Sequence, residues 1–180
     1  MRLFIAINFS DGVKNAIYTL SQELKSQSQG GRFCRRENLH LTLAFLGEVE
    51  PQRVSKVKKA LASLTIPEFN LTFDHLGRFK GRGGDIRWLG IKPCPELLDL
   101  HQALCQALKK EGFALEERPF TPHLTLGRQV TAAPLPPQGK KLAQPIGFEV
   151  RKISLMLSQR SNNGVNYSEL YCVGPGACER

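Results

Sequence analysis

The order of apolar and polar positions along the chain predicts alternating strands and helices. Short apolar runs bounded by turn residues are typical of strands, and apolar positions three or four apart are typical of helices. We expect helices that begin at Ser10 or Asp11, at Pro51 and at Pro95, and a glycine after the first and the third. Strands are predicted at residues 2–8, 32–35, 39–46, 69–76, 85–91, 120–126, 148–157 and 167–173.

This pattern predicts an α+β fold rather than a parallel, doubly wound sheet, because several strands follow one another too closely for helices to intervene. We expect a single bilobal domain over residues 1–180, with an internal pseudo-repeat. Two small antiparallel sheets, each backed by helices, would meet across a central cleft. The proline-rich stretch 129–147 is predicted to be an unusually long connection.

The tetrapeptide His-Leu-Thr-Leu occurs twice, each time inside a predicted strand, beginning at His40 and at His123. Alternate residues of a strand point to opposite faces. The leucines therefore turn to one side, whereas His40 and Thr42 turn together to the other, as do His123 and Thr125. A single His-x-Thr is more often an ordinary half-buried pair. Two identical copies instead indicate one shared site with two imidazoles and two hydroxyls.

Two histidines that face one cleft are suited to acid–base chemistry. Imidazole ordinarily titrates near pH 6.5, so a neutral ring can take a proton from water while a charged ring gives one to a departing oxygen. Each of these two proton transfers accelerates the reaction by about 10²–10⁴-fold. Thr42 and Thr125 would donate hydrogen bonds to phosphate oxygens, and Arg128 would add a cationic fork. The pattern therefore predicts metal-independent phosphoryl transfer.

The charge of the chain favours an anionic partner. Its 25 Lys and Arg residues exceed its 16 Asp and Glu residues, which gives a net charge of +9 and a pI near 9.6. Nucleic acids and phosphate esters suit such a balance. The arginines are clustered rather than evenly spread, with one group at Arg32, Arg35 and Arg36 and another at residues 78–87.

Other chemistries find less support in the sequence. Each strand offers one histidine, which is too few for a zinc site, so we expect no metal and no other cofactor. The glycine-rich segment 81–84 lacks the Gly-Lys-Ser/Thr sequence of a P-loop, and no G-x-S-x-G turn is present. His75 and His101 have no matching partner and are predicted to be structural.

The five cysteines are irregularly spaced and form no C-x-x-C pair. The apolar run at residues 3–9 is too short for a signal peptide or a membrane span. We therefore expect a protein of the reducing cytoplasm with no membrane partner. Independently of these features, we expect a monomer.

The repeated motif and its flanks resemble the two-histidine (2H) phosphoesterases. Within that superfamily the chain is most similar to the bacterial RNA 2′,3′-cyclic phosphodiesterases, also called 2′-5′ RNA ligases. The resemblance rests on the opening residues 2–7, on Asn38–Gly47 and on Arg118–Arg128, and it extends to residues 158–167 before the last strand.

This resemblance implies hydrolysis of an RNA 2′,3′-cyclic phosphate end, or of a small cyclic nucleotide, to a 2′-phosphomonoester without a metal. It also implies reversible joining of RNA ends through a 2′-5′ linkage. Carried over by motif position, His40 and His123 are the catalytic pair, and Thr42, Thr125 and Arg128 hold the phosphate. In one assignment His123 activates water and His40 protonates the leaving 3′-oxygen. The near-equivalence of the motifs leaves the reverse assignment open.

A nucleobase would stack on an aromatic side chain near the cleft, for which Phe9, Phe33 and Tyr167 are the candidates. Two other readings stay open at this point. One is an RNA- or nucleotide-binding module without turnover. The other is a phosphodiesterase for another cyclic phosphate, such as ADP-ribose 1″,2″-cyclic phosphate.

Overall fold

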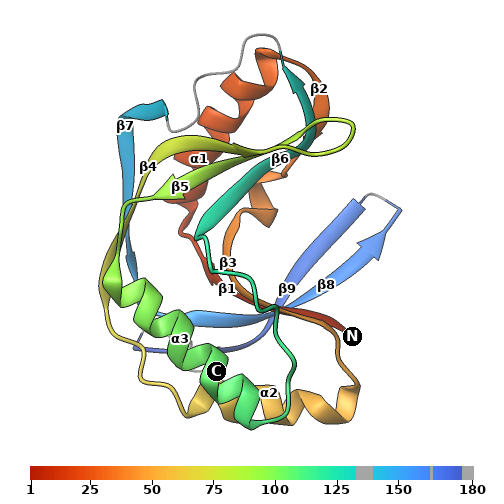
Figure 1. Ribbon diagram of the computed structural model, residues 1–180, viewed down its shortest axis with the longest axis vertical. Helices are drawn as coiled ribbons and strands as arrows, with labels where there is room; N and C mark the ends of the chain where they lie inside the picture. The colour runs from red at the N-terminus through yellow and green to blue at the C-terminus, as the bar shows by residue number, and fades with distance from the viewer. Residues whose placement is uncertain (133–139, 163, 176–180) are drawn as a thin grey trace.

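A computed structural model describes residues 1–132, 140–162 and 164–175 of the 180-residue chain. These residues form two antiparallel sheets with helices packed against them (Figure 1). The predicted α+β architecture is therefore confirmed. In the described residues, no helix is both long and apolar enough to cross a bilayer.

The smaller sheet has four strands in the order β3-β1-β8-β9. Its strands are β1 (Arg2–Asn8), β3 (His40–Glu48), β8 (Ile153–Ser161) and β9 (Gly164–Val173). The larger sheet has five strands in the order β2-β6-β5-β4-β7. Its strands are β2 (Ser28–Phe33), β4 (Phe69–Phe79), β5 (Asp85–Ile91), β6 (His123–Ala132) and β7 (Lys140–Val150).

The two sheets do not correspond to the two halves of the chain. β8, from the C-terminal part, pairs with the first strand β1, and β2, from the N-terminal part, pairs with β6. Each sheet therefore contains strands from both halves. This exchange ties the lobes together, and it places the first motif strand in one sheet and the second in the other.

Helices pack against both sheets (Figure 1). α1 (Asp11–Ser26) packs against β2 and β7 of the larger sheet. α2 (Val54–Ala62) and α3 (Pro95–Lys110) pack against each other, and they contact β9 and β3 of the smaller sheet. Two short 3-10 turns, Arg36–Asn38 and Pro51–Arg53, precede β3 and α2.

Two predicted elements differ from the structure. The single strand predicted at 148–157 is two strands of different sheets, β7 and β8, which are separated at Arg151 and Lys152. The long connection predicted at 129–147 is largely strand, since β6 continues to Ala132 and β7 begins at Lys140. Pairing with β4 provides the backbone partners of β7, which local apolar patterning does not reveal. Pro134, Pro136 and Pro137 lie outside the described residues.

Candidate active site

The two motif strands meet where the sheets face each other. β3 and β6 are in contact, and one cavity is lined by residues of both motifs, including Thr42 and His123. Leu41 and Leu124 are fully buried on the opposite faces of their strands. Both histidines and both threonines are only partly buried. The alternation of the two motifs therefore brings their polar side chains to one site.

His40 is held by its own strand and by its neighbours. Its Nδ1 donates to the backbone oxygen of Asn38 at 2.7 Å, because a carbonyl can only accept. In the neutral ring, Nε2 then carries the lone pair, and it lies 3.0 Å from Oγ1 of Thr42. The Phe4 ring lies tilted against the imidazole with centroids 4.8 Å apart, and Tyr167 meets it edge-on at 5.1 Å. These contacts fix both the tautomer and the orientation of His40.

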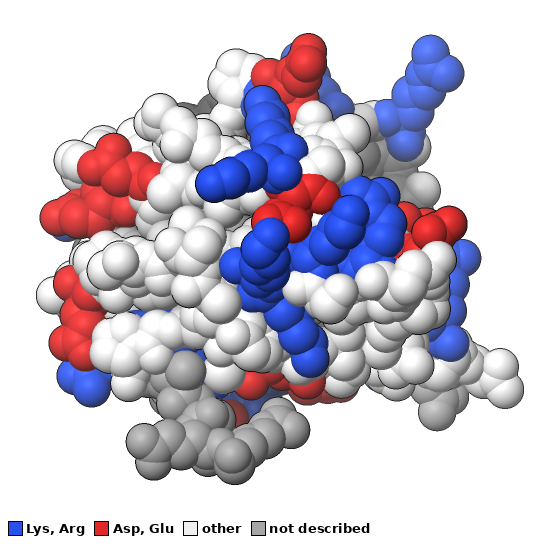
Figure 2. Space-filling model, turned by 90° about the horizontal axis from the view of Figure 1, so that it is seen from below, with Lys and Arg blue, Asp and Glu red and all other residues white. Residues whose placement is uncertain are grey.

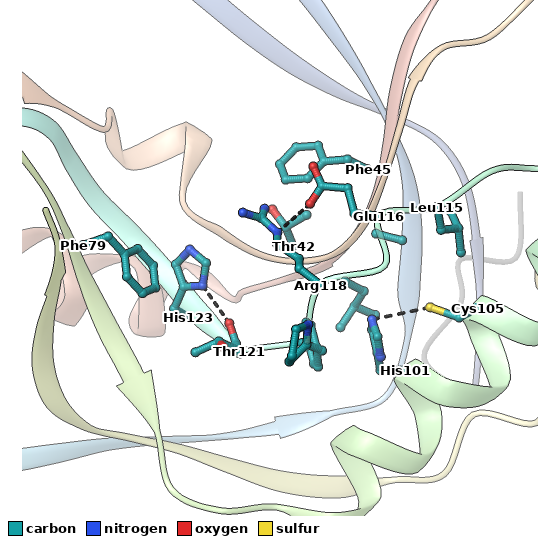
Figure 3. Close-up of a pocket in the computed structure, with 14 residues that line it drawn as sticks. Thr42, Phe45, Phe79, His101, Cys105, Leu115, Glu116, Arg118, Thr121 and His123 are labelled. Carbon is teal, nitrogen blue, oxygen red and sulfur yellow. Dashed lines mark hydrogen bonds and ion pairs between the residues drawn. The ribbon is translucent and has the colours of Figure 1, made fainter. Parts of the chain in front are cut away.

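His123 is fixed in the same way by different neighbours. Its Nδ1 donates to the backbone oxygen of Thr121 at 2.7 Å, so its Nε2 is also left for substrate. Phe79 meets the ring edge-on with centroids 5.1 Å apart, and Trp88 lies at 6.0 Å. Figure 3 shows His123 beside Phe79, with Nδ1 turned to Thr121.

Both histidines are shifted toward the neutral form. The pKa of His40 is lowered to about 4, chiefly by burial and also by the nearby cations Lys14 and Arg128, against the opposing effect of the Asn38 hydrogen bond. Burial, Arg128 and Arg118 likewise lower the pKa of His123. In the free protein both rings are therefore neutral at pH 7. The histidine that acts as the general acid must therefore gain its proton when the anionic phosphate of the substrate binds.

A β-bulge follows the motif in β6 and redirects the side chains after it. Thr125 stands opposite Trp88, but Gly127, not the residue before it, stands opposite Arg87. The extra residue shifts the alternation by one position, which brings Arg128 to the face of His123 and Thr125. In agreement with this position, the charge of Arg128 lowers the pKa of both histidines.

A β-bulge also follows the first motif. In β3, Thr42 stands opposite Ala6 and Ala44 opposite Ile5, so one extra residue is again inserted. Phe45 then stands opposite Phe4, whose ring packs against His40. Phe45 thus comes to the site face five residues after its histidine, as Arg128 does after the other.

A cavity of about 430 Å³ is lined by His123 and by Thr42 of the two motifs. It is bounded by β3, α3, β6 and the segment 115–121 between α3 and β6, and its walls are predominantly apolar. Phe45 and Phe79 are 48% and 36% exposed, which is unusual for side chains of this size, and both line this cavity (Figure 3). Such a space between aromatic rings, beside a phosphate site, is suited to a nucleobase.

The sequence did not single out Phe45 or Phe79. The signal available for Phe45 is its position, because the two motifs are equivalent and it holds the place of Arg128. Phe79 carries no comparable signal, since it lies at the end of β4 in a basic hairpin. The exposed ring becomes recognisable only once the sheet brings it beside His123.

The three aromatic residues predicted to stack with a base have different positions. Tyr167 lies at the site, against His40 and Phe4. Phe33 is at the end of β2, opposite Gly127, just before Arg128. Phe9 is 8% exposed and packs between Phe73 and Phe148, so it belongs to the core and offers no face to a base. The prediction for Phe9 is wrong, because the apolar residue after β1 turns inward.

The other histidines have local partners. His75 bonds Asp74 at 2.6 Å. His101, predicted to be structural, lines the cavity, where it stacks flat on Phe120 and lies 3.5 Å from the thiol of Cys105. Among the described residues, no group of three or more His, Cys, Asp or Glu could hold a metal ion.

The chain matches the family model of the 2′-5′ RNA ligase superfamily over residues 13–162. The RNA 2′,3′-cyclic phosphodiesterase of Thermotoga maritima is 32% identical over 179 residues, which cover 95% of this chain and 94% of that protein. That of Archaeoglobus fulgidus is 35% identical over 71% of this chain and 72% of its own. The crystal structure of E. coli LigT complexed with 3′-AMP superposes with a TM-score of 0.81 at 30% identity, over 96% of this chain and 97% of that one. The chain therefore belongs to the 2′-5′ RNA ligase superfamily, the 2H phosphoesterase group that its paired motifs resemble.

Proposed function

We propose that the protein hydrolyses 2′,3′-cyclic phosphates at RNA 3′ ends to 2′-phosphomonoesters by two-histidine acid–base catalysis. The observation that carries the proposal is the convergence of the two identical motifs, because β3 and β6 are in contact and one cavity is lined by Thr42 and His123. The names of the relatives from Thermotoga maritima and Archaeoglobus fulgidus support the same substrate.

The chemistry requires one proton to be taken and one to be given. A neutral imidazole removes a proton from water as the water oxygen bonds to phosphorus. The bond from phosphorus to the 3′-oxygen breaks, and the other, protonated imidazole delivers a proton to that oxygen. The phosphate remains on the 2′-oxygen. His40 and His123 supply the two imidazoles, each with Nδ1 held by a backbone carbonyl and Nε2 turned to the reaction.

Charge that develops on the non-bridging oxygens needs donors already in place. Arg128 provides a guanidinium whose charge acts on both rings, and the hydroxyls of Thr42 and Thr125 lie on the faces of the two histidines. The hydroxyl of Thr42 already contacts Nε2 of His40, so phosphate binding would exchange that contact for one to a phosphate oxygen. No step of this reaction calls for a metal.

The cavity beside the histidines would receive the base of the terminal nucleotide. Phe45 and Phe79 offer exposed rings for stacking, at about 1–3 kcal/mol for a base. That E. coli LigT binds 3′-AMP supports a nucleotide site in this fold. Tyr167 and Phe33 would then line the opposite side of the phosphate.

The same groups would also catalyse ligation of RNA ends. A 5′-hydroxyl in place of water would attack the cyclic phosphate and leave a 2′-5′ phosphodiester, with the same two proton transfers. The name of the superfamily favours this activity. We further expect one monomeric catalytic domain over residues 1–180 that works in the cytoplasm. Light scattering of the purified protein tests the monomer.

The decisive experiment is incubation with an RNA that ends in a 2′,3′-cyclic phosphate, with EDTA present, followed by identification of the product isomer. We expect a 2′-phosphate from the wild-type protein. Formation of a 3′-phosphate would contradict the proposed bond cleavage, and activity abolished by EDTA would contradict the mechanism. Binding of the RNA without turnover would support the binding-module reading. ADP-ribose 1″,2″-cyclic phosphate serves as the competing substrate.

A further inference from the structure

Two arginines stand side by side on neighbouring strands at the outer end of the site. Arg32 of β2 is the register partner of Arg128 of β6. Directly opposed residues of an antiparallel pair share one face, and like charges in such a pair repel each other. Both side chains are exposed. Such a pair is a natural place for an anion to bind, because an anion between the guanidinium groups removes the repulsion.

A third arginine lies on the facing sheet. Tyr167, which packs on His40, is the register partner of Ser158 on β8, so both belong to the site face. Arg160 lies two residues beyond Ser158, on the same face and about 7 Å farther along the β8–β9 hairpin. It therefore extends the site outward along the second wall, opposite the Arg32–Arg128 pair.

Arg35 joins the two walls. It follows β2, and its guanidinium lies against the backbone of Gly164 at the start of β9, where an added methyl group would come 2.7 Å from Nη2. Nearby, the Asn38 side chain donates to the backbone oxygen of Val165 at 2.7 Å. The connection from β2 to β3 is thus attached to the hairpin.

The arginine cluster is defined as Arg32, Arg35, Arg128 and Arg160. Among the described residues, the one carboxylate within 4 Å of a guanidinium of this cluster is Glu37, at 3.8 Å from Arg35. From this geometry we propose that the cluster is a second anion-binding surface, which holds the phosphodiester backbone of the RNA upstream of its cyclic phosphate. The inference rests on the proposed function, since it places the strand that carries the reacting end.

The course of the strand follows from the positions of the two subsites. The aromatic cavity lies on one side of the histidines, between β3, β6 and α3, and it would hold the terminal base. From the nucleotide that carries the terminal cyclic phosphate, the RNA chain continues in the 5′ direction only. That chain would leave between the β2–β6 edge and the β8–β9 hairpin, which projects from the smaller sheet in Figure 1.

A second basic region, on α2 and α3, is the rival path. Lys56, Lys59 and Lys110 surround Glu111, and Lys59 is bound to that carboxylate at 2.7 Å. Figure 2 faces this end of the molecule and shows the basic side chains interspersed with acidic ones. The lysines of this region are thus partly neutralised, whereas the arginine cluster includes Arg128, whose charge acts on both histidines. The strand is therefore assigned to the arginine cluster.

The test compares two substrates and two charge-matched triple variants. The substrates are an RNA tetramer ending in a 2′,3′-cyclic phosphate and a mononucleoside 2′,3′-cyclic phosphate, which has no upstream phosphodiester. The test variant carries R32Q, R35Q and R160Q, and the control variant carries three changes on α2 and α3, K56Q, K109Q and K110Q. Arg128 is left intact in both. The melting temperature of each variant is measured alongside.

We expect the arginine variant to lose about tenfold or more in kcat/KM on the tetramer, with less than about a twofold change on the mononucleotide. The lysine variant should match the wild type on both. An equal loss on both substrates, no loss, or an equal loss in the lysine variant would overturn the proposal. Arg32→Gln alone, which leaves the hairpin contact intact, should show a smaller loss with the same selectivity.

Binding separates this proposal from the proposed function. Fluorescence anisotropy with an RNA octamer that ends in a 3′-phosphate needs no turnover. In a plot of the logarithm of the binding constant against the logarithm of salt concentration, the arginine variant should have a shallower slope than the wild type. The difference should be about 2, which corresponds to three lost contacts to a single strand. Absence of turnover on both substrates would refute the proposed function. An unchanged salt slope would refute the arginine surface, whether or not the protein is active.

Discussion

The two motif strands, β3 and β6, share one tetrapeptide but have different surroundings. In each, Nδ1 of the histidine donates to a backbone oxygen two residues earlier at 2.7 Å, and a bulge follows the threonine. The residue that the bulge brings to the site is Phe45 in one strand and Arg128 in the other. One strand thus contributes an apolar ring, and the other contributes a cation.

The comparison shows how one repeated sequence serves two tasks. The hydrogen bond that orients each imidazole is made with a backbone oxygen only two residues away, so it occurs in both motifs. The residues that surround the two imidazoles differ. His40 packs against Phe4 and Tyr167 of the smaller sheet, whereas His123 packs against Phe79 in the lining of the cavity. Deeper burial lowers the pKa of His40 to about 4.

The largest expected effect comes from removing either histidine. We expect His40→Ala and His123→Ala each to lower kcat by about 10²–10⁴-fold, because each removes one proton transfer. The double variant should be little worse than the single ones, since the two groups act as a unit. His75→Ala is the matched control and should retain activity. Independent, multiplicative losses would show that the motifs are not one site.

The burial of His40 predicts a pH effect on stability. Its pKa is lowered from 6.5 to about 4, so the folded state resists protonation, and the stability it contributes above pH 6.5 is lost as the pH falls toward 4. At 1.36 kcal/mol for each pKa unit, the loss from this residue amounts to about 3 kcal/mol. Urea unfolding should therefore show His40→Gln losing less stability than the wild type between pH 7 and pH 4. Parallel losses would contradict the burial of the neutral ring.

The residues at the two bulges should separate binding from chemistry. Arg128→Ala should lower kcat by about 10- to 100-fold, because a charged donor to the phosphate is lost. Phe45→Ala should mainly raise KM, by about fivefold or more, because base stacking is lost while the phosphate contacts remain. Steady-state kinetics on one cyclic nucleotide measures both. Identical changes in kcat and KM for the two variants would remove the distinction between the strands.

The smallest expected effect comes from Asn38, which supports the ring of His40 but not that of His123. Its side chain donates to the backbone oxygen of Val165 on β9 at 2.7 Å, while its own backbone oxygen accepts from His40. Asn38→Ala should lower kcat/KM by about two- to tenfold. The substitution removes the hydrogen bond to Val165, which holds in place the backbone oxygen that accepts from His40. Asn38→Asp, which cannot donate, should behave alike and serves as the comparison. An effect of Asn38→Ala alone would indicate that the hydrogen bond has no positioning role.

The sequence predicted most of what is local in this molecule. Strand alternation placed His40 and Thr42 on one face, and the turn residues bounded most elements. The exchange of β2 and β8 between the sheets was not predictable, since pairing between distant strands leaves no local pattern. Phe9 and Phe45 show the same limit, because an aromatic residue in an apolar run has no mark that separates core from site. Two bulges, visible only in the register, decide which side chains reach the cleft.

The pH dependence of kcat/KM for the wild type and for the two histidine variants tests the paired acid–base site most directly. The account predicts a bell-shaped wild-type profile with its maximum on the acid side of pH 6.5, because the pKa values of both histidines are lowered. The residual activity of His40→Ala and of His123→Ala should each lack one limb, and not the same one. A flat wild-type profile, or both limbs retained in both variants, would contradict the account.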